Sequence, residues 1–414
     1  MGRLRRSRLT RVHVLRRVGF ERIRLAVLTA GLFVESWPLF QYWNGPHVLN
    51  ADYWKGIFAG RALFGAMPGY HGGPLHIYTA MPQLHVGPPI VVLAGTLGRW
   101  QYGMQAWAVL ILLSGLVSVA AVERAAIALG GDRTRVRIAG TIGAVLVLAG
   151  WPALLQFMHL EDALAIALIA VAAVVIAERR PWWLLALTLG FAAGCKSWAA
   201  MVWPLLLMID RPYRIRAAGV AVATAVVWWV PFVVADRATI SAISDVTIVM
   251  PHSGLVAFGL PVWHAAPDHV RLLQMLLGFS FAALAVVRGR WTAAPLAAFA
   301  SRGLVEPSFF VYYGVGTLVA ALLWDVTSSR RLPVWTMGAI TSQFFLQLWV
   351  PDVVGSIAHA AFAVAVVVAA AWPVQRTISM RSPLSSHSGS DGTRTTARAM
   401  IRRAVQSDTA PSMR

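Results

Sequence analysis

The residues of this chain that could do chemistry lie in four short segments between apolar stretches, and the first begins at Asp52. It reads Asp52-Tyr53-Trp54-Lys55 and continues to Arg61. A carboxylate surrounded by aromatic side chains suits a sugar-handling site, because aromatic faces pack on pyranose rings and the carboxylate can take the proton of an attacking hydroxyl group. The alternative is that Asp52 only caps a short helix.

The second and third segments combine acids with a lysine. His159, Glu161 and Asp162 precede an apolar run, and Lys196 lies in Gly194-Cys195-Lys196-Ser197-Trp198. A lysine in an apolar stretch costs roughly 2.5–3.5 kcal/mol at the bilayer centre, so it is rarely placed there without a partner. We expect a lipid phosphate as that partner. The alternatives are that Lys196 pairs with Glu161 or Asp162, and that these acids only stabilise a helix N-terminus.

The fourth segment carries Arg302, with Glu306 four residues later and the pair Tyr312-Tyr313 beyond it. A guanidinium group can form a forked contact with a phosphate, or it can pair with the nearby carboxylate of Glu306. Both interpretations stay open on the sequence. The histidines of the segment after Asp52 match no metal-ligand spacing, so the sequence predicts neither a metal nor a cofactor.

The composition indicates a polytopic, all-α membrane protein. Hydrophobic residues make up 58% of the 414 residues and charged residues only 13%, against about 25% charged residues in ordinary soluble domains. The formal net charge of +19 lies largely in the two tails and in short turns, where it attracts anionic lipid headgroups. We therefore expect membrane lipids rather than nucleic acid as partners. The lone Cys195 excludes an intramolecular disulfide.

Arginine-rich junctions alternate along the chain with junctions that hold Asp, Glu and His. The positive-inside rule places the arginine-rich junctions and both termini in the cytoplasm, so the candidate residues are expected on the exterior face of the plasma membrane. This sorting predicts about twelve transmembrane helices. We expect them at 25–43, 104–124, 138–156, 161–178, 181–194, 197–209, 215–234, 270–287, 292–305, 308–326, 333–350 and 355–372.

The expected domain organisation is a basic cytoplasmic tail over 1–24, a transmembrane domain over 25–372 and a disordered basic cytoplasmic tail over 373–414. Residues 44–103 form a large first exterior loop, in which 88–97 is the only apolar piece and is predicted to be an interfacial helix. The pair 181–194 and 197–209 is short for two crossings. It is expected either as a half-depth hairpin or as one helix broken near Gly194.

The order of these motifs resembles that of the actinobacterial polyprenol-phosphate-mannose-dependent mannosyltransferases of glycosyltransferase family 87, in the C-type superfamily. The resemblance covers about residues 30–350 and departs from the family pattern at Gly87 and Ser308. The motifs that carry it are Asp52-Tyr53, Gly87-Pro88-Pro89, His159-Leu160-Glu161-Asp162-Ala163-Leu164-Ala165, Gly194-Cys195-Lys196-Ser197-Trp198, Trp203-Pro204-Leu205-Leu206 and the segment from Arg302 to Tyr313.

The resemblance implies a C-type glycosyltransferase-like helical bundle that moves a sugar, mannose in that family, from a polyprenyl phosphate donor to a lipid or glycan acceptor. It implies Asp52 as the general base, with inversion at the anomeric carbon, and it fits Lys196 and Arg302 as ligands of the donor phosphate. A secondary transporter and a non-catalytic scaffold are the alternatives, although we find no repeat of the kind that transporters show. The expected substrate-binding or supporting residues are Tyr53, Lys55, Arg61, His159, Glu161, Asp162, Glu306, Tyr312 and Tyr313.

Overall fold

The chain is all-α, as its composition predicts. The computed structural model describes residues 23–38, 52–67, 69–81, 84–243, 248–267, 269–307, 310–328 and 332–372. Within these ranges the only β-type pairing is an isolated bridge between Ile248 and Ala265, and there is no sheet. The expected tail over 373–414 and almost all of that over 1–24 lie outside the described residues.

Among the described residues, five helices are long and apolar enough to cross a membrane. Each contains at least 18 residues, which is about 27 Å at 1.5 Å per residue and close to the ~30 Å hydrocarbon core. All five coincide with expected crossings. Of the other seven, 25–43 lies partly outside the described residues, and the described parts of the remaining six are shorter or interrupted helices. The five are α5 (Gly103–Ala128), the α6–α7 pair (Arg133–Gly150 and Pro152–Gln156), α8 (Leu160–Ala177), α14 (Val270–Val287) and α19 (Asp352–Ala371).

The short pair after α8 is a hairpin rather than one broken helix; the half-depth placement that the sequence suggested for it stays a prediction. Helix α9 (Trp182–Cys195) and the 3₁₀ helix η1 (Ser197–Met208) are separated at Lys196, whose backbone is extended. The Trp203 indole N–H donates to the carbonyl of Leu189 at 3.2 Å, so the two segments lie side by side. Because a 3₁₀ helix rises about 2.0 Å per residue, the 12 residues of η1 reach roughly 24 Å.

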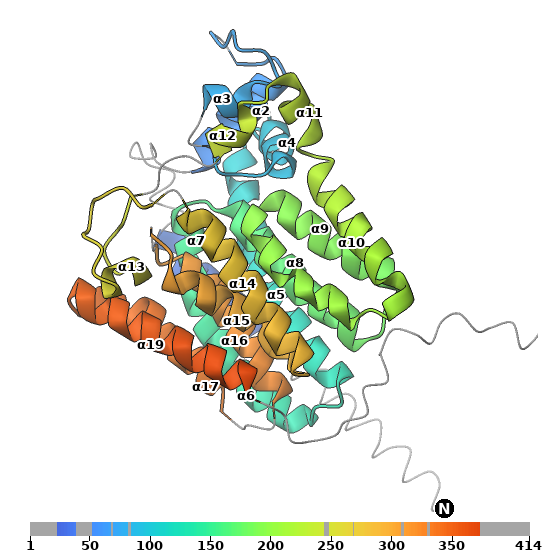
Figure 1. Ribbon diagram of the computed structural model, residues 1–414, viewed down its shortest axis with the longest axis vertical. Coiled ribbons are helices and arrows are strands. Elements are labelled where there is room, and N and C mark those ends of the chain that lie inside the picture. The colour runs from blue at the N-terminus through green and yellow to red at the C-terminus, as the bar shows by residue number, and fades with distance from the viewer. Residues whose placement is uncertain are drawn as a thin grey trace, which may run out of the picture.

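Helices α5 and α8 pack against each other at the centre of the bundle, and further helices pack around them (Figure 1). Asp325 joins two of these further helices, because its carboxylate accepts hydrogen bonds from the backbone and hydroxyl of Thr336 at 2.8 and 2.9 Å. The further helices are α10 (Arg211–Val226), α15 (Ala294–Leu304), α16 (Tyr313–Thr327), α17 (Val334–Ile340), the π-helical turn Thr341–Phe345 and α18 (Leu346–Trp349).

Short helices form a cap at one end of this bundle (Figure 1). The helix predicted over 88–97 is α4, which spans Pro88–Leu97, and its interfacial position stays a prediction. It crosses α2 at Gly60 and Gly95, where a Cβ atom on Gly60 would overlap the backbone of Gly95. Tyr78 packs against Trp229 and Phe232, with ring centroids 4.9 and 5.2 Å apart. The loop before α5 and the segment after α10 therefore share one layer. Its helices are α2 (Asp52–Leu63), α3 (Ile77–Ala80), α4, α11 (Val230–Ala235) and α12 (Thr239–Ile243).

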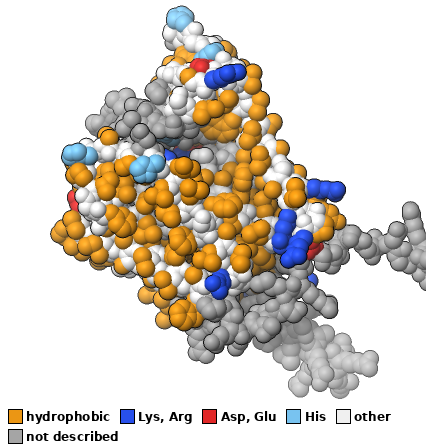
Figure 2. Space-filling model, in the orientation of Figure 1, with side chains coloured by type: hydrophobic (Ala, Val, Ile, Leu, Met, Phe, Trp, Pro, Cys, Tyr) orange, Lys and Arg blue, Asp and Glu red, His pale blue; other side chains and the backbone are white. Residues whose placement is uncertain are grey.

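Several arginines lie at the opposite end of the bundle. Arg24 forms an ion pair with Glu123, and Arg124 and Arg180 both contact Glu178, the C-cap of α8. Between the two ends the visible face is largely hydrophobic, with charged side chains at its margins (Figure 2). The predicted separation of the arginine clusters from the acidic junctions is therefore present along α8, over about 27 Å for its 18 residues.

Candidate functional site

The site begins at the N-terminus of α8, where the chain turns sharply. Met158 has a left-handed backbone (φ 57°), and its carbonyl accepts a hydrogen bond from the Trp107 indole at 2.9 Å. This turn presents His159, whose Nδ1 lies 2.8 Å from Oε1 of Glu161. The imidazole stacks on the Tyr312 ring with centroids 3.9 Å apart. Tyr312, the N-cap of α16 (Tyr313–Thr327), thus holds the histidine beside a carboxylate.

Lys196 reaches both carboxylates of α8. Its Nζ lies 3.1 Å from Oε1 of Glu161 and 3.4 Å from Oδ2 of Asp162. The side chains of Glu161 and Lys196 are only 0% and 13% exposed. The extended backbone at Lys196, which ends α9, turns this side chain toward the start of α8. The pairing that the sequence offered as the alternative partner of Lys196 is therefore present.

Arg302 lies in the last turn of α15 and has a carboxylate partner as well. Its Nη2 is 2.7 Å from Oε2 of Glu306, and Nη1 of Arg271 is 3.1 Å from Oε1 of the same residue. The Arg302 guanidinium also lies over the Trp198 and Tyr313 rings, at 5.7 and 5.0 Å from their centroids. Aromatic faces stabilise a cation in this position without neutralising it.

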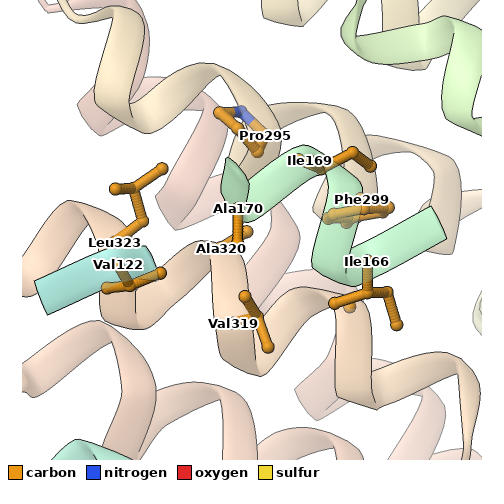
Figure 3. Close-up of a pocket in the computed structure, with 10 residues that line it drawn as sticks. Val122, Ile166, Ile169, Ala170, Pro295, Phe299, Val319, Ala320 and Leu323 are labelled. Atoms are coloured by element: carbon orange, nitrogen blue, oxygen red, sulfur yellow. The ribbon is translucent and has the colours of Figure 1, made fainter. Parts of the chain in front are cut away.

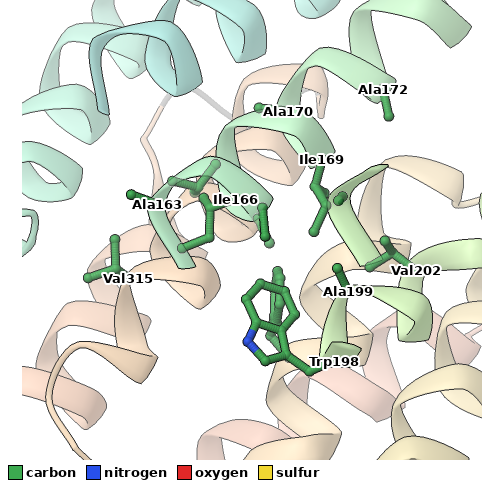
Figure 4. Close-up of a cluster of buried hydrophobic side chains, with 14 of the residues drawn as sticks. Ala163, Ile166, Ile169, Ala170, Ala172, Trp198, Ala199, Val202 and Val315 are labelled. Carbon is green, nitrogen blue, oxygen red and sulfur yellow. The ribbon is translucent and has the colours of Figure 1, made fainter. Parts of the chain in front are cut away.

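Trp198 joins the two ion-pair groups. Its indole N–H donates to Oδ1 of Asp162 at 2.8 Å, and its ring lies beneath Arg302. The rest of the indole is enclosed by apolar side chains of α8 and η1, including Ile166 and Ala199 (Figure 4). We call this set of residues the charge cluster. It comprises His159, Glu161, Asp162, Lys196, Trp198, Arg271, Arg302, Glu306, Tyr312 and Tyr313.

The expected general base lies at the start of α2, but the side chains of Asp52 and Tyr53 are outside the described residues. Lys55 is exposed on α2. Arg61, near the end of that helix, donates to the carbonyl of Gly98 at 3.1 Å. The described part of α2 therefore contributes no side chain to the contacts of the charge cluster given above.

Gly87 connects the cap to the charge cluster. Its N–H donates to the carbonyl of Cys195 at 3.0 Å, directly before Lys196. A Cβ atom at position 87 would overlap the carbonyl oxygen of Gly194. A glycine is thus required at position 87, where α4 meets the end of α9. Cys195 itself, the only cysteine, is 0% exposed.

Three groups of the cluster have the spacing of metal ligands. One donor atom from each of His159, Glu161 and Asp162 lies within 4.8 Å of the others. The Lys196 ammonium group contacts both carboxylates, so one positive charge already lies between them. A metal ion here would compete with that ammonium group; the expectation of no metal stays a prediction.

Sequence reasoning missed the contributions of Trp198 and Arg271. The indole N–H of Trp198 was detectable in principle, because a tryptophan two residues after a buried lysine needs a partner for its N–H. Arg271 lies in the first turn of α14, far along the chain from Glu306, and only the packing of α14 on α15 brings them together.

Beside the cluster the bundle is tightly packed. A gap of about 10 Å³ between α5, α8, α15 and α16 is lined by apolar side chains such as Ile166, Phe299 and Val319 (Figure 3). It is too small for a ligand. Scans against protein-family models, curated proteins and solved structures found no match for this chain.

Proposed function

We propose that this chain is a membrane glycosyltransferase that moves a sugar from a polyprenyl phosphate donor to a lipid or glycan acceptor on the exterior face, with inversion. Mannose is the sugar that the family resemblance favours. The observation that carries the proposal is the charge cluster, in which Trp198 links two cations: Lys196 pairs with Asp162, which accepts the indole N–H, and Arg302 lies over the indole ring. Ionisable groups inside a membrane bundle are costly and usually functional.

The cluster fits a phosphate that arrives with a lipid. Lys196 and Arg302 are held by Glu161, Asp162 and Glu306, so both cations are already in place before the donor binds. The donor phosphate then accepts hydrogen bonds from both, and the same contacts stabilise the charge of the departing polyprenyl phosphate. Stabilisation of a leaving group by fixed cations lowers the barrier without any cofactor.

Asp52 completes the mechanism as the general base. It takes the proton of the acceptor hydroxyl while that oxygen bonds to the anomeric carbon, and the bond from this carbon to the phosphate oxygen breaks. The packing of α2 on α4 and the hydrogen bond from Gly87 to Cys195 support this role, because they link the helix that starts at Asp52 to the residue before Lys196.

The test is sugar transfer from a synthetic short-chain polyprenyl phosphate mannose by the purified chain in detergent. Asp52→Asn keeps the size of the side chain but removes the base, so kcat should fall by about 10²- to 10⁴-fold. Donor binding, measured separately, should change little. Asp132→Asn is the matched control, because Asp132 caps α6 through a hydrogen bond from Arg135 N–H at 2.8 Å, a bond that asparagine can also accept.

Two results would overturn parts of the proposal. Near-normal turnover by Asp52→Asn would move the base to another acid, with Glu161 or Asp162 the first to examine. Absence of transfer by the natural chain, together with no binding of the donor, would remove glycosyl transfer itself and favour a transport or scaffolding role.

A further inference from the structure

A second polar cavity lies in the cap, formed by residues separate from the charge cluster. It occupies about 450 Å³ where α2 meets the turn from α4 into α5, which is within the ~300–1,000 Å³ typical of small-molecule sites. The proposed mechanism makes no use of it. The described residues that line it are Trp54, Ile57, Arg61, Gly98, Arg99, Trp100, Gln101, Met104 and Gln105.

The cavity is positively charged. Arg61 and Arg99 line it, and the described lining includes no Asp or Glu. Arg61 is oriented by its hydrogen bond to the carbonyl of Gly98 at 3.1 Å, and the Arg99 guanidinium lies 4.8 Å from the centroid of the Phe64 ring. Both cations are positioned by neutral neighbours in these contacts, so they keep their charge for an anionic ligand. Two guanidinium groups on one cavity are suited to a phosphate.

The other lining groups suit a polyhydroxylated ring. Trp54 and Trp100 offer broad aromatic faces, and Gln101 and Gln105 offer amides that both donate and accept hydrogen bonds. Among the described residues, Oε1 of Gln105 is buried without a hydrogen-bond partner. A buried acceptor without a partner costs about 1–3 kcal/mol, and rotation of the Gln105 side chain toward the cavity would let a ligand hydroxyl group satisfy it.

We propose that this cavity binds a phosphate-bearing saccharide or cyclic polyol, with the phosphate on Arg61 and Arg99 and the ring between the indoles and the glutamine amides. The ligand can come from a lipid headgroup or from a water-soluble sugar phosphate, since the recognised chemistry is the same. Its residues are distinct from the charge cluster, although Arg61 was also expected from the sequence as a substrate-binding or supporting residue. The test does not depend on glycosyl transfer, because binding is measured without a donor.

The first experiment measures binding of glucose 6-phosphate, glucose and inorganic phosphate to the purified full chain in neutral detergent. Glucose 6-phosphate should bind most tightly. The double variant Arg61→Gln, Arg99→Gln should weaken it by about tenfold or more, given the strength of hydrogen bonds to charged groups. The matched control is Arg237→Gln, because Arg237 is also exposed in the cap but does not line the cavity. Equal loss in the control would overturn the proposal.

A second variant keeps the test independent of folding. Gln105→Leu removes the buried acceptor but leaves both arginines. It should therefore weaken the binding of glucose 6-phosphate more than the binding of inorganic phosphate. The saccharide proposal fails if the variant weakens the binding of both ligands equally. It also fails if the natural chain binds inorganic phosphate as tightly as glucose 6-phosphate, because the site then recognises an anion only.

Reconstitution into bilayers distinguishes the two sources. Native mass spectrometry would compare retention of phosphatidylinositol with that of phosphatidylglycerol, which carries the same charge but no ring. Preferential retention that the double arginine variant abolishes supports a lipid headgroup; equal retention, with glucose 6-phosphate still bound, supports a soluble ligand. Failure of both ligands to bind would overturn the proposal and leave the transfer mechanism untouched.

Discussion

The two ends of the bundle both carry ion pairs, but they differ in exposure. At the charge-cluster end, the side chains of Glu161, Asp162 and Glu306 are 0%, 4% and 2% exposed. At the arginine-rich end, Arg124 and Arg180 are 61% and 53% exposed, and of the described ion pairs there only that of Arg24 with Glu123 is largely buried, at 9% and 16%. Exposed pairs are screened by water and salt and contribute little. Buried pairs lose their hydration and need nearly complete compensation.

The contrast separates two uses of the same side chains. The exposed arginines can orient the chain in the membrane through their charge alone, and the geometry of each pair matters little there. The buried charges require a fixed partner for every group, which is why four helices and η1 contribute to one cluster. Burying this many charges costs free energy, so their presence within the bundle favours a functional role.

The largest effect should follow from removing the central cation of the buried end. Lys196→Gln leaves Glu161 and Asp162 without the ammonium group between them, and breaking a buried pair by removing one partner typically costs about 3–5 kcal/mol. The measurement is thermal unfolding of the purified chain in detergent. Arg124→Gln is the control from the exposed end, and its Tm should stay close to that of the natural chain.

Similar losses of Tm in Lys196→Gln and Arg124→Gln would contradict the difference between the buried and the exposed end. A double variant, Lys196→Gln with Glu161→Gln, tests whether Lys196 stabilises the bundle through its charge. Removal of the second charge should restore part of the lost Tm, because one of the two unbalanced carboxylates disappears. No restoration would mean that Lys196 stabilises the bundle by packing rather than by charge.

A smaller effect is expected where the cap meets the buried end. Gly87→Ala places a methyl group on the carbonyl of Gly194, so α4 must shift or the hydrogen bond to Cys195 must lengthen. Overpacking of this kind costs about 1–3 kcal/mol. Gly219→Ala is the control, because a Cβ atom at position 219 meets nothing within 4 Å. Equal Tm values for the two variants would show that the cap is not seated on α9 as described.

The smallest effect concerns an ion pair of intermediate exposure. His252 Nε2 lies 3.4 Å from Oδ1 of Asp352, with side chains 17% and 46% exposed. Burial lowers the pKa of His252 below its ordinary value of 6.5, and the charge of Asp352 partly opposes this. The folded state therefore binds the proton less readily than the unfolded state. The contribution of His252 is complete above pH 6.5 and is lost as the pH falls through its folded pKa.

Hydrogen exchange of the amides between 248 and 267, corrected for intrinsic rates, tests this sign. Protection should fall as the medium is acidified below the ordinary pKa of histidine, and His252→Gln should remove the pH dependence. Protection that rises on acidification would mean that attraction to Asp352 outweighs burial.

Much of the fold was predictable because apolar run length is a direct physical requirement of a membrane. The predicted helix over 88–97 matches α4, and 161–178 and 270–287 match α8 and α14 within one residue. Interruptions were harder to predict. The 3₁₀ helix after Lys196 and the π-helical turn at Thr341–Phe345 depend on packing against neighbouring helices, which no local pattern encodes.

The residues of the charge cluster were predictable, but their partners were not. An isolated lysine or arginine in an apolar segment indicates that a partner exists. The sequence could not decide between a phosphate and a carboxylate for Lys196 and Arg302, because that choice depends on which helix ends meet in space. Gly87 shows the same limit: it departs from the family pattern in the sequence, and only the contact with Gly194 gives its physical reason.

The enclosure of Cys195 has a practical consequence for spectroscopy. The only thiol of the chain is 0% exposed, so bulky maleimide or spin-label reagents find no accessible target on the natural folded protein. Single cysteines introduced at exposed positions, such as Thr134 beside the arginine-rich end or Trp263 in the segment before α14, can then carry probes one at a time. Distances between such probes can be measured without first removing the native cysteine and disturbing the junction that it shares with Gly87.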